Sequence, residues 1–175
     1  MWWLGLFGCG DPSAIPEPLG LCTTCPDSCE ESFSLATSAT HVWGGVDYDD
    51  PPPSSGDHDP CWADWGVHTS PVPDEQWVHN LEHGGVVFLY NCPDGCPDEL
   101  ATLTTLTESL GVFALLTPYD ALPTRFGAVA WQWRFLTDCL ERDDFAQFWE
   151  ARRDQAPEST PAPPPDSCSA IGASG

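Results

Sequence analysis

The sequence predicts an α+β domain with a small, mostly antiparallel sheet and helices packed on one face. Three observations support this class. Residues 84–91 (GGVVFLYN) form a continuous apolar run, which is typical of a buried strand. Leucines repeat at helical spacing from Leu100 to Leu110, and residues 126–136 (FGAVAWQWRFL) alternate between two faces. The predicted order is strand, helix, strand, strand, helix.

The remaining elements follow from local signals. Residues 33–46 contain scattered β-forming residues before a glycine pair, which predicts a short strand leading into a long loop at 47–66. A helix is predicted at 97–110, because Pro97 and two acidic residues begin it and Gly111 ends it. A strand at 112–117 and a final helix at about 143–154 complete the set.

The composition along the chain predicts three parts. Residues 1–32 read as a signal-like start and flexible tether, 33–155 as one folded domain, and 156–175 as a disordered Pro, Ala and Ser-rich tail. The charge is strongly acidic, with 27 Asp and Glu against 5 Lys and Arg. Such a surface repels phosphate backbones and anionic lipids, so we expect no nucleic-acid partner and no membrane contact except through a lipid anchor. A protein partner cannot be named from the sequence.

Nine cysteines in 175 residues indicate an exported protein of the cell envelope, in the periplasm or on the outer surface. Residues 6–9 (LFGC) resemble a lipoprotein lipobox at the end of a short apolar start, which predicts a signal peptide and lipidation at Cys9. The other eight are disulfide candidates. Cys92 with Cys96 predicts a local bridge and Cys61 with Cys139 a long one, and Cys168 is expected to join Cys22, Cys25 or Cys29.

All five histidines lie between positions 41 and 83: His41, His58, His68, His79 and His83. Residues 79–85 (HNLEHGG) contain two of them with Glu82 and a glycine pair. At helical spacing, His79 and His83 would share one face with Cβ atoms about 5–6 Å apart, which suits two ligands of one metal ion. Glu82 would act as an outer hydrogen-bonding group or an acid/base, and Gly84 and Gly85 would let the backbone approach a bound group.

The motifs resemble those of one known family. They are His-Val at 41–42, PPSSGDH at 52–58, Gly-Val at 66–67, VHNLEHGGVV at 78–87, Pro118 and Ala-Trp at 130–131. Over positions 41 to 150 this pattern resembles the bacterial family called domain of unknown function 3105. One residue is inserted in the SGDH element, and His68 stands where an aromatic residue is expected. The resemblance implies an exported or membrane-attached domain and no established activity.

The donor types predict a metal site for Zn(II) or Cu(II), with His58, His79 and His83 as ligands and His41 or His68 as further candidates. The only methionine is Met1, which excludes a thioether-rich cuprous site. Two alternatives stay open. The histidines and Glu82 could form a metal-free structural or interaction network, or a metal with an open position could make the protein a hydrolase. Whether the protein is an enzyme is therefore undecided, and no catalytic residue is assigned.

Overall fold

The computed structural model describes residues 16–162 and 167–172 of the chain. Cys9 and the lipobox-like segment lie outside the described residues. No helix within the described ranges is both long enough and apolar enough to cross a membrane.

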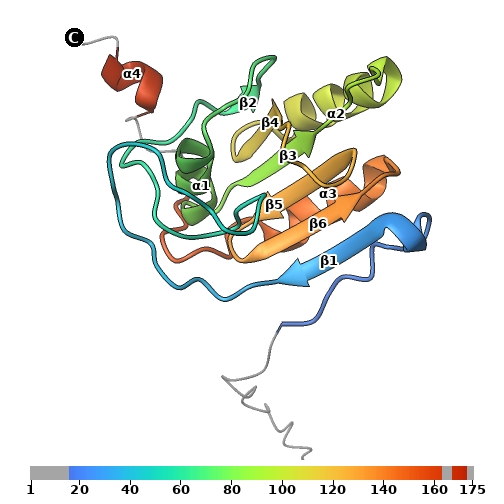
Figure 1. Cartoon of the computed structure of the whole chain (residues 1–175), viewed down its shortest axis with the longest axis horizontal. Helices are drawn as coiled ribbons and strands as arrows, with labels where there is room; N and C mark the ends of the chain where they lie inside the picture. Colours follow the sequence, from blue (N-terminus) through green and yellow to red (C-terminus); the bar gives the residue numbers. More distant parts are fainter. Residues whose placement is uncertain (1–15, 163–166, 173–175) are drawn as a thin grey trace, which may run out of the picture.

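A six-stranded sheet forms the centre of the domain, in the order β1-β6-β5-β3-β4-β2 (Figure 1). The strands are β1 (Cys29–Phe33), β2 (Gly66–Val67), β3 (Val86–Tyr90), β4 (Ala114–Pro118), β5 (Phe126–Ala130) and β6 (Trp133–Thr137). The pairs β1–β6, β6–β5 and β5–β3 are antiparallel, whereas β3–β4 and β4–β2 are parallel. The α+β class and the mostly antiparallel sheet are thereby confirmed.

Within the described residues, four α-helices and one short 3-10 helix accompany the sheet. They are η1 (Pro26–Ser28), α1 (Asp74–Glu82), α2 (Pro97–Leu110), α3 (Arg142–Arg152) and α4 (Cys168–Gly172). The bounds of α2 are those predicted, and α3 begins one residue before the predicted range and ends two residues earlier. For α1, the sequence predicts only a helical turn around the two histidines.

Helices cover both faces of the sheet, so the prediction that they pack on one face is wrong. Val86 and Phe88 of β3 lie in one core cluster with residues of α2 and α3. Val87 and Leu89 lie in a second cluster with Leu81 and other residues of α1. Successive strand residues point to opposite faces. Because the whole of β3 is apolar, each face needs its own cover.

The single strand predicted over 126–136 is a hairpin of β5 and β6. The chain reverses at Trp131 and Gln132, with Ala130 opposite Trp133. Gln132 has a positive φ of 67°, and its backbone N–H donates to the Ser54 carbonyl (2.7 Å). Because Ala130 and Trp133 lie opposite each other on one face, Trp133 and Phe135 share the core cluster of Ala128 and Ala130, whereas one continuous strand would place them on the other face.

The first strand also differs from its prediction. Strand β1 ends at Phe33, where the predicted strand began. Residues 34–46 are irregular apart from an isolated parallel bridge between His41 and His58. The bridge joins two loops that are distant in sequence, because Val42 N–H donates to the His58 carbonyl (2.8 Å) and His58 N–H donates to the Thr40 carbonyl (3.1 Å).

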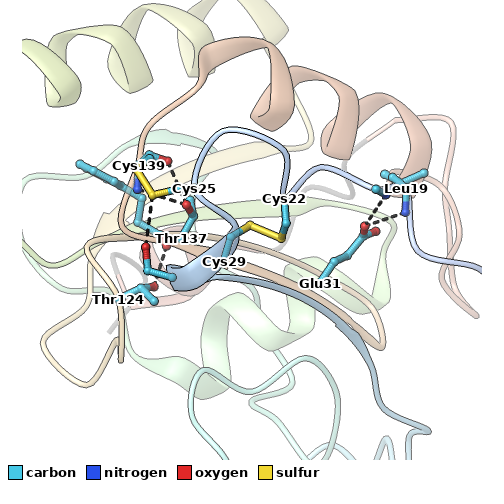
Figure 2. The surroundings of a disulfide bond; sticks show 11 residues. Leu19, Cys22, Cys25, Cys29, Glu31, Thr124, Thr137 and Cys139 are labelled. Atoms are coloured by element: carbon cyan, nitrogen blue, oxygen red, sulfur yellow. Dashed lines mark hydrogen bonds between the residues drawn. A yellow bond between two sulfur atoms is a disulfide. The ribbon is translucent and has the colours of Figure 1, made fainter.

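Eight cysteines form four disulfides: Cys22–Cys29, Cys25–Cys139, Cys61–Cys168 and Cys92–Cys96. The local Cys92–Cys96 bridge is the predicted one. The predicted Cys61–Cys139 bridge is wrong, because Cys139 follows β6 and the pairing of β6 with β1 brings it to Cys25 (Figure 2). Cys168 joins Cys61 and none of the N-terminal three. Several disulfides indicate an oxidising, extracytoplasmic location.

The end of the chain returns to the sheet region. Asp154 N–H donates to the Gly84 carbonyl (2.9 Å), and Glu158 N–H donates to the Glu82 carbonyl (3.1 Å). Further along, Cys168 N–H donates to the Trp62 carbonyl (2.8 Å). The division of the chain into tether, domain and tail stays a prediction, but residues 154–158 contact the end of α1.

Candidate metal centre

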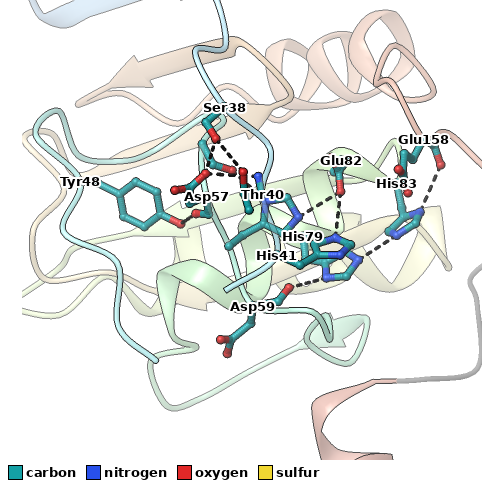
Figure 3. A network of polar contacts seen from close by, with 12 residues as sticks. Ser38, Thr40, His41, Tyr48, Asp57, Asp59, His79, Glu82, His83 and Glu158 are labelled. Atoms are coloured by element: carbon teal, nitrogen blue, oxygen red, sulfur yellow. Dashed lines mark hydrogen bonds and ion pairs between the residues drawn. The ribbon is translucent and has the colours of Figure 1, made fainter. Parts of the chain in front are cut away.

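Helix α1 positions two of the candidate ligands. Asp74 and Glu75 lie in its first turn, where acidic side chains interact favourably with the positive end of the helix dipole. Trp77, Val78 and Leu81 are fully buried in the core of the domain. His79, Glu82 and the helix-ending His83 face the loops that carry His41 and His58 (Figure 3). The apolar residues that fix the helix on the sheet thus also fix the direction of its polar residues.

Two glycines lie between α1 and β3, and both are needed for packing. Gly84 has a positive φ of 87°, and a Cβ there would lie 2.8 Å from Ser159 Oγ. A Cβ on Gly85 would overlap the Trp65 ring and lie 2.9 Å from the Asn80 carbonyl oxygen. The predicted close approach at this glycine pair is therefore made by the protein itself, in the form of Trp65 and residues 154–159.

Four side chains converge at the end of α1. They are His41, His58, His79 and Glu82, whose candidate ligand atoms all lie within 4.8 Å of one another. Glu82 Oε2 lies 3.0 Å from His58 Nε2 and 3.4 Å from His41 Nε2. The His41 and His79 rings stack with centroids 4.7 Å apart. We call these four residues the quartet.

His83 lies beside the quartet. Its Nε2 is 2.8 Å from His79 Nε2, and the two rings stack with centroids 4.8 Å apart. His83 forms a second group of potential ligands with Glu82 and Glu158. A third group consists of Asp59, Cys61 and Cys168, but those two cysteines are joined in a disulfide and offer no thiolate.

The structure does not bring His68 to this cluster. The Nε2 of His68 donates to the Asp64 carbonyl (2.7 Å) on the exposed side of the loop. His68 therefore stabilises its own loop, and four of the five candidate histidines lie in the cluster.

Main-chain carbonyls fix the orientation of three buried rings. The Nδ1 atoms of His58, His79 and His83 donate to the carbonyls of Gly56 (2.8 Å), Asp59 (2.6 Å) and Glu158 (3.1 Å), respectively. A carbonyl can only accept, so each Nδ1 carries the proton and each neutral ring presents an unprotonated Nε2 to the cluster. This tautomer is the one commonly found for histidines that bind metal through Nε2.

Burial and mutual charge determine which rings carry a proton. Burial, together with the neighbouring histidines, lowers the pKa of His79 to about 4. Burial also acts to lower the pKa of His58, but the hydrogen bond and charge of Glu82 outweigh it and raise that pKa above 6.5. For Glu82, burial acts to raise the pKa, and its contacts with His58 outweigh this and lower it. The His79 ring is thus neutral at neutral pH and has a lone pair on Nε2 that can bind a metal ion.

Aromatic rings enclose the cluster. Trp62 packs edge-on against His79 and His83, with centroid distances of 5.3 and 5.4 Å. Trp131 packs edge-on against His58 at 6.4 Å. His58, His79 and Glu82 are 0%, 2% and 3% exposed, whereas the His41 side chain is 43% exposed. The quartet is therefore closed except on the His41 side.

Some contributors were not predicted from the sequence. Glu158 lies in the segment expected to be a disordered tail, where nothing in the composition marks it. The carbonyls of Gly56 and Asp59 are main-chain groups that any residue type could supply. For these carbonyls, the sequence offers one signal: Gly56 lies two residues before His58 in the PPSSGDH element.

The fold and the cluster define a disulfide-containing α+β domain with a buried His/Glu centre at one end of its sheet. The chain belongs to the family described as protein of unknown function (DUF3105), whose model matches residues 41–165. The matched span contains every residue of the cluster, from His41 to Glu158. Comparison with curated proteins and with solved structures gives no match.

Proposed function

We propose that this protein binds one transition-metal ion, Zn(II) or Cu(II), through the quartet of His41, His58, His79 and Glu82. Three imidazole nitrogens and one carboxylate oxygen form a nitrogen-rich donor set that suits both ions. Four donors from the protein match the coordination number of a structural Zn(II) site. The strongly acidic surface, with a formal net charge of −22, attracts cations toward the domain.

One observation carries the proposal: at two contacts of hydrogen-bonding length, both groups are acceptors when the imidazole rings are neutral. With its Nδ1 proton donated to Gly56, neutral His58 offers only a lone pair to the Glu82 carboxylate at 3.0 Å. His79 and His83 confront each other in the same way at 2.8 Å. Two acceptors repel each other at this distance, so each contact is stable only when a proton or a metal ion binds to one or both of the two atoms. One ion bound in the quartet accepts the lone pairs of His58, His79 and Glu82 together.

Burial favours a closed binding site over a hydrolytic one. A hydrolase needs a coordination position that water and substrate can reach. Three of the four donors are buried, and the partly exposed His41 leaves a route by which an ion can enter and leave. We therefore propose metal binding and not hydrolysis.

We further propose that the protein acts outside the cytosol, attached to a membrane by a lipid on Cys9, and that it has no nucleic-acid partner. Eight cysteines are used in disulfides, so Cys9 is the one cysteine left for another role. Fractionation of bacteria that express the chain and its C9S variant tests this. The unaltered chain is expected with the membranes and C9S in the soluble fraction, and equal distribution of the two would contradict lipidation.

Titration of the metal-free protein, purified without a His tag, with Zn(II) and Cu(II) tests metal binding. We expect binding tighter than micromolar. H41A is the informative variant, because its partly exposed side chain can be removed with little effect on folding. It is expected to weaken binding by at least 10–100-fold, roughly the loss seen when even outer-shell partners of a site are removed.

H68A is the matched control, since His68 is a histidine of the same region outside the cluster. It should leave the affinity unchanged. Two results would favour the alternative of a metal-free structural network: affinity no tighter than micromolar for both ions, or equal weakening by H41A and H68A.

A further inference from the structure

The donor groups extend beyond the quartet. Glu82, His83 and Glu158 form an adjoining set whose candidate ligand atoms also lie within 4.8 Å of one another. Glu82 belongs to both sets. The two sets also touch through the 2.8 Å contact between His79 Nε2 and His83 Nε2. Two ligand groups joined by one carboxylate are the arrangement found in sites that hold a pair of metal ions.

We propose that the cluster binds a second divalent cation through His83, Glu158 and Glu82, with the Glu82 carboxylate bridging the two ions. This inference depends on the proposed function, because Glu82 must also serve the first ion. The two carboxylates balance part of the added charge, and the imidazole of His83 adds a nitrogen donor. In carboxylate-bridged pairs the ions lie about 3.5–4 Å apart.

The backbone holds the second donor set in place. Glu158 N–H donates to the Glu82 carbonyl (3.1 Å), and the Glu158 carbonyl accepts from His83 Nδ1 (3.1 Å). These two bonds fix residue 158 against the end of α1 (Figure 3). The Nδ1 bond also turns His83 Nε2 inward. The main chain thus orients both His83 and the residue that supplies the second carboxylate.

Exposure distinguishes the two positions. The quartet is mostly buried, whereas Glu158 is exposed to solvent. With three protein donors and solvent on one side, the second ion completes its coordination with water. The first ion is therefore expected to bind more tightly, and the second to exchange more readily.

The stoichiometry of Zn(II) tests the inference. The metal-free full-length protein and its E158Q variant are titrated by calorimetry, and bound zinc is measured after desalting. We expect two ions for the unaltered protein and one for E158Q, with the tighter affinity retained. E108Q, which removes an exposed carboxylate from α2, is the matched control and should bind two ions.

Every other outcome is decisive. One ion in the unaltered protein would overturn the second site and leave the proposed function intact. Two ions in both the unaltered protein and E158Q would overturn the assignment to Glu158. No bound ion would overturn the proposed function itself. As an independent reading, the second equivalent of Cu(II) should produce the half-field electron paramagnetic resonance signal of a coupled pair, and E158Q should lack it.

Discussion

His79 and His83 face each other at the C-terminal end of α1, with their Nε2 atoms 2.8 Å apart and each Nδ1 donating to a main-chain carbonyl. Two neutral rings in this state present lone pair to lone pair. Stacking at 4.8 Å between centroids and burial against Trp62 keep the rings from turning away. The helix thus holds an arrangement that a cation stabilises.

The histidines should titrate in an unusual order in the metal-free protein. Burial lowers the pKa of His79 to about 4, so it should stay neutral down to that pH. The pKa of His58 is raised above 6.5 because Glu82 outweighs the effect of burial, so His58 should hold a proton at pH 6.5. Nuclear magnetic resonance titration of the imidazole Cε1–H signals checks the order. Protonation of His79 before His58 would contradict it.

Metal binding should therefore release a proton near pH 7. An ion can bind His58 only after the proton on its Nε2 leaves. The Nε2 of His79 carries no proton at this pH, so His79 releases none. Calorimetric titration with Zn(II) in two buffers of different ionisation enthalpy measures the number released. The expected result is a net release that falls toward zero as the pH is raised well above the pKa of His58. A release that does not change with pH would place the proton elsewhere.

The sequence reveals the part of the site that lies within one element and conceals the part made by distant segments. The spacing of His79, Glu82 and His83 in VHNLEHGGVV predicts a shared helical face, because 3.6 residues per turn is a local property. Nothing local distinguishes His41 from His68. His41 joins the cluster because the backbone bridge between His41 and His58 brings it there, and that bridge is a contact between distant parts of the chain.

The same limit applies to the fold. Helix α2 follows from its own residues, since a proline begins it, a glycine ends it and leucines line it. The partner of Cys139 depends on which strand lies beside β6, and sheet order is a property of the whole chain. Cover of both sheet faces depends on where α1 docks. The apolar character of β3 already required that cover, but the sequence did not show that α1 would supply it.

G85A should destabilise the protein and weaken the metal site. A Cβ at this position overlaps the Trp65 ring and lies 2.9 Å from the Asn80 carbonyl, so the end of α1 must shift. Overpacking of this kind costs about 1–3 kcal/mol of unfolding free energy. Urea denaturation of the metal-free protein measures it. G45A is the control, because nothing lies within 4 Å of a Cβ there. Equal stability of the two variants would contradict this account.

D74N should change the pH dependence of stability. Burial raises the pKa of Asp74 above 3.8, although the Tyr119 hydroxyl donates to its Oδ2 at 2.8 Å. A raised pKa means that the folded state binds the proton more tightly than the unfolded state. Stability should therefore fall as the pH rises from the unfolded pKa through the raised folded pKa.

Asparagine has no such charge to bury and keeps an oxygen for the Tyr119 hydroxyl. The unfolding free energy of D74N minus that of the unaltered protein should grow as the pH rises through this window, and then stay constant. Denaturation series at several pH values give this difference, in which the effects of other carboxyl groups cancel. A difference that shrinks with rising pH would show that the folded-state pKa is lowered.

Removal of the Cys61–Cys168 bridge should cost more stability than removal of Cys92–Cys96. The first joins residues 107 positions apart and the second only 4 apart. Because a longer closed loop restricts the unfolded chain more, the chain-entropy treatment gives a difference of about 3 kcal/mol between them. The double variants C61A/C168A and C92A/C96A, compared by chemical denaturation, measure it.

Cys168 N–H also donates to the Trp62 carbonyl, and Trp62 packs on His79 and His83. Loss of the long bridge should therefore weaken metal binding as well, and loss of the short bridge should not. Equal effects of the two double variants on metal affinity would separate the C-terminal segment from the site.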